Sequence, residues 1–91
     1  MEKSNPIVGI ICEDFKTFRR IKKILEPDNP YFLFSIIKNE QHYFAQDFFA
    51  IICYGNDFTG FDVERIEEHF NKTHDKLFIR IDEIFESFKI N

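Results

Sequence analysis

Three carboxylates follow apolar runs that have the character of β-strands. Glu13 and Asp14 come directly after Ile7–Cys12, and Asp57 follows Phe48–Tyr54. Residues that follow parallel strands gather at one edge of an α/β sheet, where binding and active sites usually lie. Carboxylates gathered there could hold Mg²⁺ through oxygen ligands and support phosphoryl transfer. The simpler interpretation, which we favour, is that Asp14 caps a helix, Asp57 shapes a turn and Glu13 is solvated.

Cysteines and histidines offer the other candidate chemistry, and their spacing argues against it. Cys12 and Cys53 form no Cys-x-x-Cys pair, so a zinc site of the usual kind is not expected. Both are expected to be buried, reduced thiols, although the helix that follows Cys12 leaves a thiolate nucleophile as an alternative. His42, His69 and His74 are expected on the surface. We therefore expect no catalytic residue, no metal and no cofactor.

The spacing of apolar residues predicts the elements that must position these side chains. Strands are expected at Ile7–Cys12, Tyr31–Ile37, Phe48–Tyr54 and Lys76–Ile81. Helices are expected after the cap Asp14, from about Asp62 to Lys72, and from Asp82 to Lys89. In the first helix, the apolar stripe consists of Phe18, Ile21 and Leu25.

The segment Asn39–Asp47 decides between two folds. As a helix, it gives a small four-stranded, mostly parallel α/β sheet with flanking helices. As a hairpin turn, it gives the ferredoxin-like βαββαβ arrangement. Because Ile7–Cys12, Phe32–Ile37 and Phe48–Cys53 are nearly continuous apolar runs, both sheet faces are expected to be covered by helices, which favours the parallel sheet.

Length and composition indicate one globular domain that spans residues 1–91. Apolar residues make up 44% of the chain, and 13 of the 91 residues are phenylalanine, so a core of adequate size is available. Neither a signal peptide nor an apolar run of membrane-spanning length is recognisable. We expect a cytoplasmic protein that does not associate with membranes.

Charge is spread unevenly along the chain. Residues 1–45 sum to +1 and residues 46–91 to −5, which gives the net charge of −4. This balance disfavours nucleic acid as a partner and favours a protein with a basic surface. Glu64, Glu67 and Glu68 are the candidate contacts in the acidic half. The first helix carries a compact basic patch, which we interpret as a solvated face; it comprises Arg19, Arg20, Lys22 and Lys23.

Several of these segments resemble a response-regulator receiver domain in degenerate form, over roughly residues 7–66. Ile7–Asp14, followed by Phe18–Arg20, is similar to the first strand, acidic pair and first helix of that family. Phe49–Ile52 resembles its third strand, and Phe58–Asp62 resembles the Met-Pro-Gly-Met-Asp signature that opens its third helix. The resemblance implies a receiver- or flavodoxin-like fold.

The same comparison implies that the family's phosphate relay is missing. Gly55 stands where the family carries its phosphorylated aspartate, and Asp57 is two residues out of register. The chain also ends before the part that holds the family's lysine, so the fold is expected to be truncated. Without acceptor and lysine, phosphoryl transfer loses both its nucleophile and its charge stabilisation.

The resulting hypothesis is a non-catalytic regulatory module that binds another protein. Its candidate contacts are Glu13, Asp14 and Asp57, together with the acidic residues of the helix that begins at Asp62. An alternative is a small acidic inhibitor, such as a toxin-immunity protein or a phage-encoded antagonist. A second alternative is the magnesium-dependent phosphoryl-transfer site, and a homodimer through an edge strand at Leu77–Ile81 is also possible.

Overall fold

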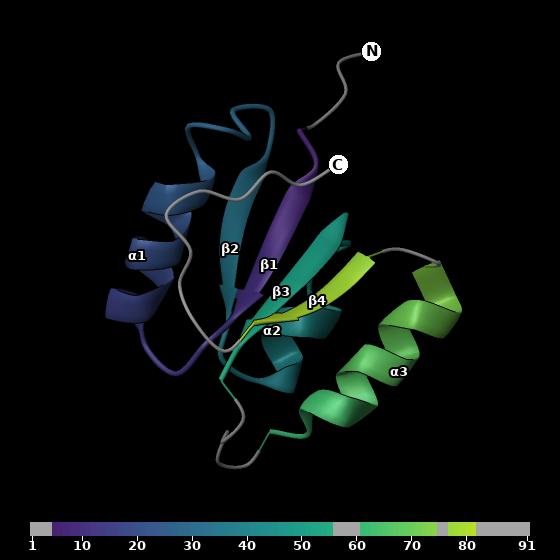
Figure 1. Cartoon of the computed structure of the whole chain (residues 1–91). Helices are drawn as coiled ribbons and strands as arrows, with labels where there is room; N and C mark the ends of the chain where they lie inside the picture. The colour runs from purple at the N-terminus through teal and green to yellow at the C-terminus, as the bar shows by residue number, and fades with distance from the viewer. Residues whose placement is uncertain (1–4, 56–60, 75–76, 82–91) are drawn as a thin grey trace.

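Four parallel strands form the sheet of the described structure, in the spatial order β2-β1-β3-β4 (Figure 1). The computed structural model describes residues 5–55, 61–74 and 77–81. Its strands are β1 (Ile7–Ile11), β2 (Leu33–Ile37), β3 (Ala50–Tyr54) and β4 (Leu77–Ile81). All three strand pairs are parallel, with Ile10 facing Ile36 on one side and Ile52 on the other.

Helices cover both faces of this sheet, as the continuous apolar runs predicted. Helix α1 (Phe15–Leu25) lies on one face, and α2 (Glu40–Phe44) and α3 (Val63–His74) lie on the other (Figure 1). The described part of the chain is therefore a small α/β domain of receiver- or flavodoxin-like architecture. The predicted helix Asp82–Lys89 lies outside the described residues.

The connection between β2 and β3 confirms the parallel arrangement. Asn39 begins α2, because its side chain accepts a hydrogen bond from the backbone N–H of His42 at 3.0 Å. The short helix carries the chain across β1, so that β3 pairs with β1 in parallel. The alternative ferredoxin-like arrangement, which needs an antiparallel hairpin here, is wrong.

Polar side chains define the ends of the two longer helices. The backbone N–H of Thr17 donates to the Asp14 carboxylate at 2.8 Å, and that of Arg65 donates to Asp62 at 3.1 Å. Both predicted N-caps are thus confirmed. At the end of helix α1, the buried Asn29 side chain donates a hydrogen bond to the Leu25 carbonyl at 2.8 Å. This carbonyl belongs to the last turn, whose carbonyl groups have no donor within the helix.

Two apolar clusters, one on each face, hold the layers together. On the α1 side, Val8 and Ile10 pack with Phe18, Ile21 and Leu25. The opposite cluster is built around fully buried side chains of the sheet and of α3, and it includes Ile11, Ile51, Phe48, Ile66 and Phe70. The alternation of β1 residues between the two clusters follows from the period of two along a strand.

The apolar run at β2 is less buried than its composition suggested. Because β2 lies at one edge of the sheet, Leu33 is 52% exposed, and only Ile37 is fully buried. At the other edge of the described sheet lies β4, as expected for Leu77–Ile81, and its exposed and half-buried residues partly alternate.

Candidate functional site

The carboxyl ends of the strands bring Glu13 and Asp14 to one edge of the sheet, as expected. Both side chains are exposed, and Asp14 is engaged as the N-cap of α1. Its hydrogen bonds from Thr17 hold the pKa of the Asp14 carboxyl below its usual value, with smaller contributions from the Lys16 and Lys38 charges. The structural role expected for Asp14 is therefore present.

Replacement of Asp14 by asparagine should alter how stability depends on pH. A folded-state pKa below the unfolded value of 3.8 means that ionised Asp14 stabilises the fold above that pH. This contribution is lost as the pH falls through the lower, folded-state value, whereas an asparagine side chain keeps the cap without titrating. Urea unfolding of both proteins from pH 2 to pH 7 should show their stability difference changing only at the acidic end. A difference that changes between pH 5 and pH 7 would contradict this role.

Both cysteines are buried free thiols at the same edge of the sheet, as the sequence indicated. Burial raises the pKa of Cys12 to about 11, and the neighbouring Asp14 charge contributes to this rise. Burial likewise raises the pKa of Cys53 to about 11. The environment at the start of α1 therefore favours the neutral thiol of Cys12, which is opposite to what a nucleophile needs.

Slow thiol labelling is the expected consequence. A shift from the ordinary value of 9.0 to about 11 lowers the thiolate fraction near neutral pH roughly 100-fold, and burial restricts access further. Iodoacetamide at pH 7.5 should thus modify Cys12 and Cys53 at least about 100-fold more slowly in the folded protein than in urea. Mass spectrometry over time measures both rates, and rapid labelling of Cys12 in the folded protein would show a reactive thiol.

The segment that follows β3, where the sequence placed Asp57 in the predicted carboxylate site, is described only as far as Gly55. Gly55 has φ of 99°, a left-handed conformation in which a residue with a side chain is strained. The backbone conformation at position 55 thus favours glycine. Asp57 lies outside the described residues, as do residues 56–60 around it. Among the residues that are described, no group of three or more metal-ligating side chains occurs.

The glutamates of α3 make ion pairs with neighbouring side chains. Arg80 on β4 donates to Glu67 from two nitrogens, at 3.0 and 2.7 Å, and Lys72 donates to Glu68 at 2.9 Å. Glu64 adds an electrostatic attraction for Arg80. These interactions raise the pKa of Arg80 and lower that of Glu68. Glu67 and Glu68 are therefore already engaged with basic side chains.

Helix α1 presents the opposite situation. Five of its eleven residues are cationic and none is acidic; the cations are Lys16, Arg19, Arg20, Lys22 and Lys23. Four of the five are exposed and Lys22 is half-buried, and none forms an ion pair with another described residue. We call these five residues the cationic face. They lie on the outer side of α1 because Phe18, Ile21 and Leu25 occupy the side against the sheet.

Exposed aromatic rings occur at the first position of α1 and in the loop that follows it. Phe15, at the first position of α1, is 53% exposed, and the Lys38 amine lies 5.6 Å from the centre of its ring. Tyr31, in the loop that follows α1, is 74% exposed. Large exposed rings beside positive charge are typical of protein-binding surfaces.

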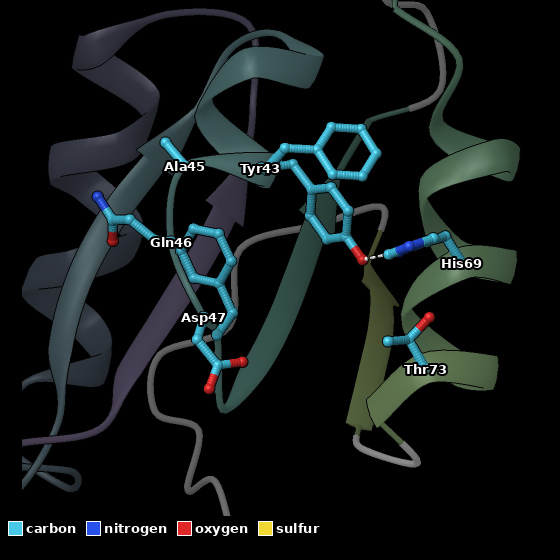
Figure 2. Close-up of a pocket in the computed structure, with 8 residues that line it drawn as sticks. Tyr43, Ala45, Gln46, Asp47, His69 and Thr73 are labelled. Atoms are coloured by element: carbon cyan, nitrogen blue, oxygen red, sulfur yellow. Dashed lines mark hydrogen bonds between the residues drawn. The ribbon is translucent and has the colours of Figure 1, made fainter.

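A groove on the other face of the sheet was not predicted from the sequence. It has a volume of about 510 Å³ and lies between the α2–β3 connection and the second half of α3 (Figure 2). The hydroxyl of Tyr43 and Nδ1 of His69 are hydrogen-bonded at 2.6 Å across it. Burial raises the pKa of Tyr43. Phe44, Asp47 and Thr73 also line the groove.

The histidines follow the expectation where they are described. His42 and His69 are exposed, and the backbone N–H of Lys38 donates to Nδ1 of His42 at 3.1 Å. The side chain of His74 lies outside the described residues. His42 and His69 thus make hydrogen bonds to protein groups at two separate places in the fold.

No protein-family model, curated protein or solved structure matches the chain. The architecture is that of a small parallel α/β domain with the strand order β2-β1-β3-β4. None of the helices in the described ranges has the length and apolarity needed to cross a membrane.

Proposed function

We propose that this protein is a non-catalytic regulatory module that binds another protein, and that the cationic face of α1 is its main contact. The observation that carries the proposal is the concentration of five positive charges on eleven residues, with no acidic residue among them. Such a face attracts an acidic protein surface and accelerates association with it.

Three observations support the non-catalytic part of this proposal. Asp14 is engaged as a helix cap, and the pKa of Cys12 is raised to about 11. Gly55 has a left-handed backbone that favours glycine, and the sequence resemblance to receiver domains aligns this position with their acceptor aspartate. Each of these groups has a structural explanation that does not require a reaction.

The charge of the proposed partner differs from the one inferred from the sequence. A basic partner would have to compete with Arg80 for Glu67 and with Lys72 for Glu68. An acidic partner meets the cationic face without breaking any ion pair between described residues. The net charge of −4 opposes long-range attraction to a polyanion such as nucleic acid, whereas a local acidic patch on a protein matches a local cationic face.

The experiment is affinity capture with charge-reversal variants of matched size. The test protein carries Arg19→Glu, Arg20→Glu and Lys23→Glu, and the control carries Glu64→Lys, Glu67→Lys and Glu68→Lys. All six positions lie on helix surfaces, so both variants should fold, which circular dichroism verifies. The lysate of the source cells is treated with nuclease, and capture is measured at low and high salt.

We expect one protein, captured in stoichiometric amount by the wild type and by the α3 control, to be reduced about tenfold or more by the α1 variant. Its capture should also weaken at high salt, because salt screens exposed charges. Loss of capture with the α3 variant alone would contradict the proposal and favour the acidic-inhibitor alternative. Capture from an untreated lysate that is lost from the nuclease-treated lysate would also contradict the proposal, because binding would then depend on nucleic acid.

A further inference from the structure

Strand β2 lies at an open edge of the described sheet. The backbone N–H of Leu33 donates to the carbonyl of Pro6, directly before β1, at 2.9 Å. Because the backbone groups of successive strand residues point alternately to the two sides, those of Phe34 and Ile36 point away from β1. No described residue bonds to them there. They form a row of open donors and acceptors to which another extended chain can pair.

The side chains of β2 do not oppose such pairing. Open edges of natural sheets are usually protected by charged side chains or by proline. The strand Leu33–Ile37 contains neither, since its sequence is Leu-Phe-Ser-Ile-Ile. Leu33 is 52% exposed, although it belongs to the face of the sheet on which Ile37 is buried. The edge therefore offers both backbone groups and apolar surface to a further strand.

One side of the cationic face borders this edge. Half-buried side chains of β2 pack in the apolar cluster of α1, and Figure 1 shows the two elements side by side. The Lys38 amine, directly after β2, lies 5.6 Å from the centre of the Phe15 ring. Arg19 and Lys22 follow Phe15 by four and seven residues, so they share its side of α1. That side of α1 therefore faces β2.

These charges determine which kind of chain the edge accepts. A second copy would pair its own β2 in antiparallel orientation, about a two-fold axis perpendicular to the sheet. Both α1 helices would then lie on the same face, and the side of α1 that carries Arg19 and Lys22 would approach its copy. Like charges in such an interface oppose association. An acidic strand gains the same backbone hydrogen bonds together with ion pairs.

We propose that β2 binds an extended acidic segment of the partner protein as an additional strand. This inference rests on the proposed function, because it specifies the partner segment that meets the cationic face. Side chains of the added strand alternate between the two faces of the sheet. Acidic residues on the α1 face meet Arg19 and Lys22, and apolar residues on the other face meet Leu33. The ligand is thus a segment in which acidic and apolar residues alternate.

Hydrogen exchange of single amides tests the edge in the wild-type protein. Without a ligand, the amides of Phe34 and Ile36 should exchange at least about tenfold faster than those of Ser35 and Ile37, which point to β1. The probe is an acetylated and amidated hexapeptide of alternating glutamate and valine. It should slow exchange at Phe34 and Ile36 about threefold or more, with a dissociation constant on the order of 1 mM. The same peptide with lysine in place of glutamate should not.

Two pairs of variants separate backbone pairing from charge, with peptide binding measured by amide chemical shifts. Ile36→Pro removes an outward N–H and should abolish binding, whereas Ile36→Ala keeps that N–H and should bind within about twofold of the wild type. Arg19→Gln with Lys22→Gln should weaken binding about three- to tenfold. Lys16→Gln with Arg20→Gln changes the charge equally on the outer side of α1 and should weaken binding less than about twofold. Circular dichroism verifies the fold of each variant.

The proposal is overturned if Phe34 and Ile36 exchange as slowly as their neighbours without peptide, or if the lysine peptide binds as well as the glutamate peptide. Protection that appears without peptide and grows with protein concentration would assign the edge to a second copy and likewise overturn it. Retained binding by a folded Ile36→Pro protein has the same consequence. If that variant does not fold, the exchange pattern of the wild-type protein decides.

Capture of the partner distinguishes failure of this inference from failure of the proposed function. Capture that is lost on charge reversal of α1 and also with Ile36→Pro, but kept with Ile36→Ala, supports both. Capture that is lost on charge reversal and kept with Ile36→Pro leaves the cationic face as the contact and overturns pairing at β2. Capture that charge reversal does not change overturns the proposed function itself.

Discussion

Truncation of Phe70 to alanine is expected to lower the free energy of unfolding by about 3–5 kcal/mol, because it leaves a cavity in a fully buried cluster. Phe70 is 0% exposed, and its ring packs against Tyr43 and Phe78. It attaches α3 to both α2 and the sheet. A domain of this size has a total stability of roughly 5–15 kcal/mol, so the variant should be close to unfolding. Thermal denaturation should show a melting temperature lower by more than about 10 °C.

Phe44→Ala is the matched control for this prediction. The residue type is the same, yet Phe44 is 55% exposed, and its truncation should cost about 1 kcal/mol or less. Urea unfolding of the two variants gives both values. If Phe70→Ala were no more destabilising than Phe44→Ala, the packing of α3 described above would be incorrect.

Gly9→Ala should destabilise the protein by about 1–3 kcal/mol through overpacking. A Cβ atom at position 9 would lie 2.5 Å from Cδ1 of Ile37 and 3.0 Å from two ring atoms of Phe48. Both neighbours are buried, so relief of the contact requires side chains of the core to shift. The close approach of the Ile37 and Phe48 side chains thus explains why β1 carries a glycine in its centre.

A second substitution makes this prediction specific to the contact. Ile37→Val removes the Cδ1 atom that meets the new Cβ, and alone it should cost about 0.5–1.5 kcal/mol. In the Gly9→Ala protein it should cost less or restore stability, so the two changes should be coupled in a double-mutant cycle. Additive effects in urea unfolding would contradict the close approach of Gly9 and Ile37.

The fold could be predicted from local patterns because each pattern has one physical cause. Phe18, Ile21 and Leu25 recur at helical spacing, and the structure buries all three against the sheet. Asp14 and Asp62 are N-caps whose side chains accept the expected backbone hydrogen bonds. The apolar runs favoured a parallel sheet, and the helix that follows Asn39 confirms this arrangement.

Burial at the edges of the sheet could not be predicted with the same accuracy. The run at β2 is as apolar as that at β3, yet β2 has a neighbour on one side only, and Leu33 remains exposed. Composition indicates that a segment prefers to form a strand, whereas the solvent exposure of that strand depends on which elements lie beside it. The exposed rings of Phe15 and Tyr31 were missed for the same reason.

The ion pairs on the charged surfaces depend on contacts that the sequence does not reveal. Glu67 and Arg80 are 13 residues apart, and only the pairing of β4 beside α3 brings them to 2.7 Å. The acidic helix therefore carries less uncompensated charge than its composition suggested. The groove near Tyr43 and His69 was unpredictable in the same way, because those residues are 26 positions apart.

Protection of lysines in the complex with the captured protein tests the central proposal most directly. Acetylation rates of individual lysines are measured by mass spectrometry for the protein alone and for the complex. The proposed docking surface predicts that Lys16, Lys22 and Lys23 become protected, while Lys72 on α3 keeps the rate it has in the protein alone. Protection of Lys72 with unchanged rates at the three α1 lysines would contradict docking through the cationic face.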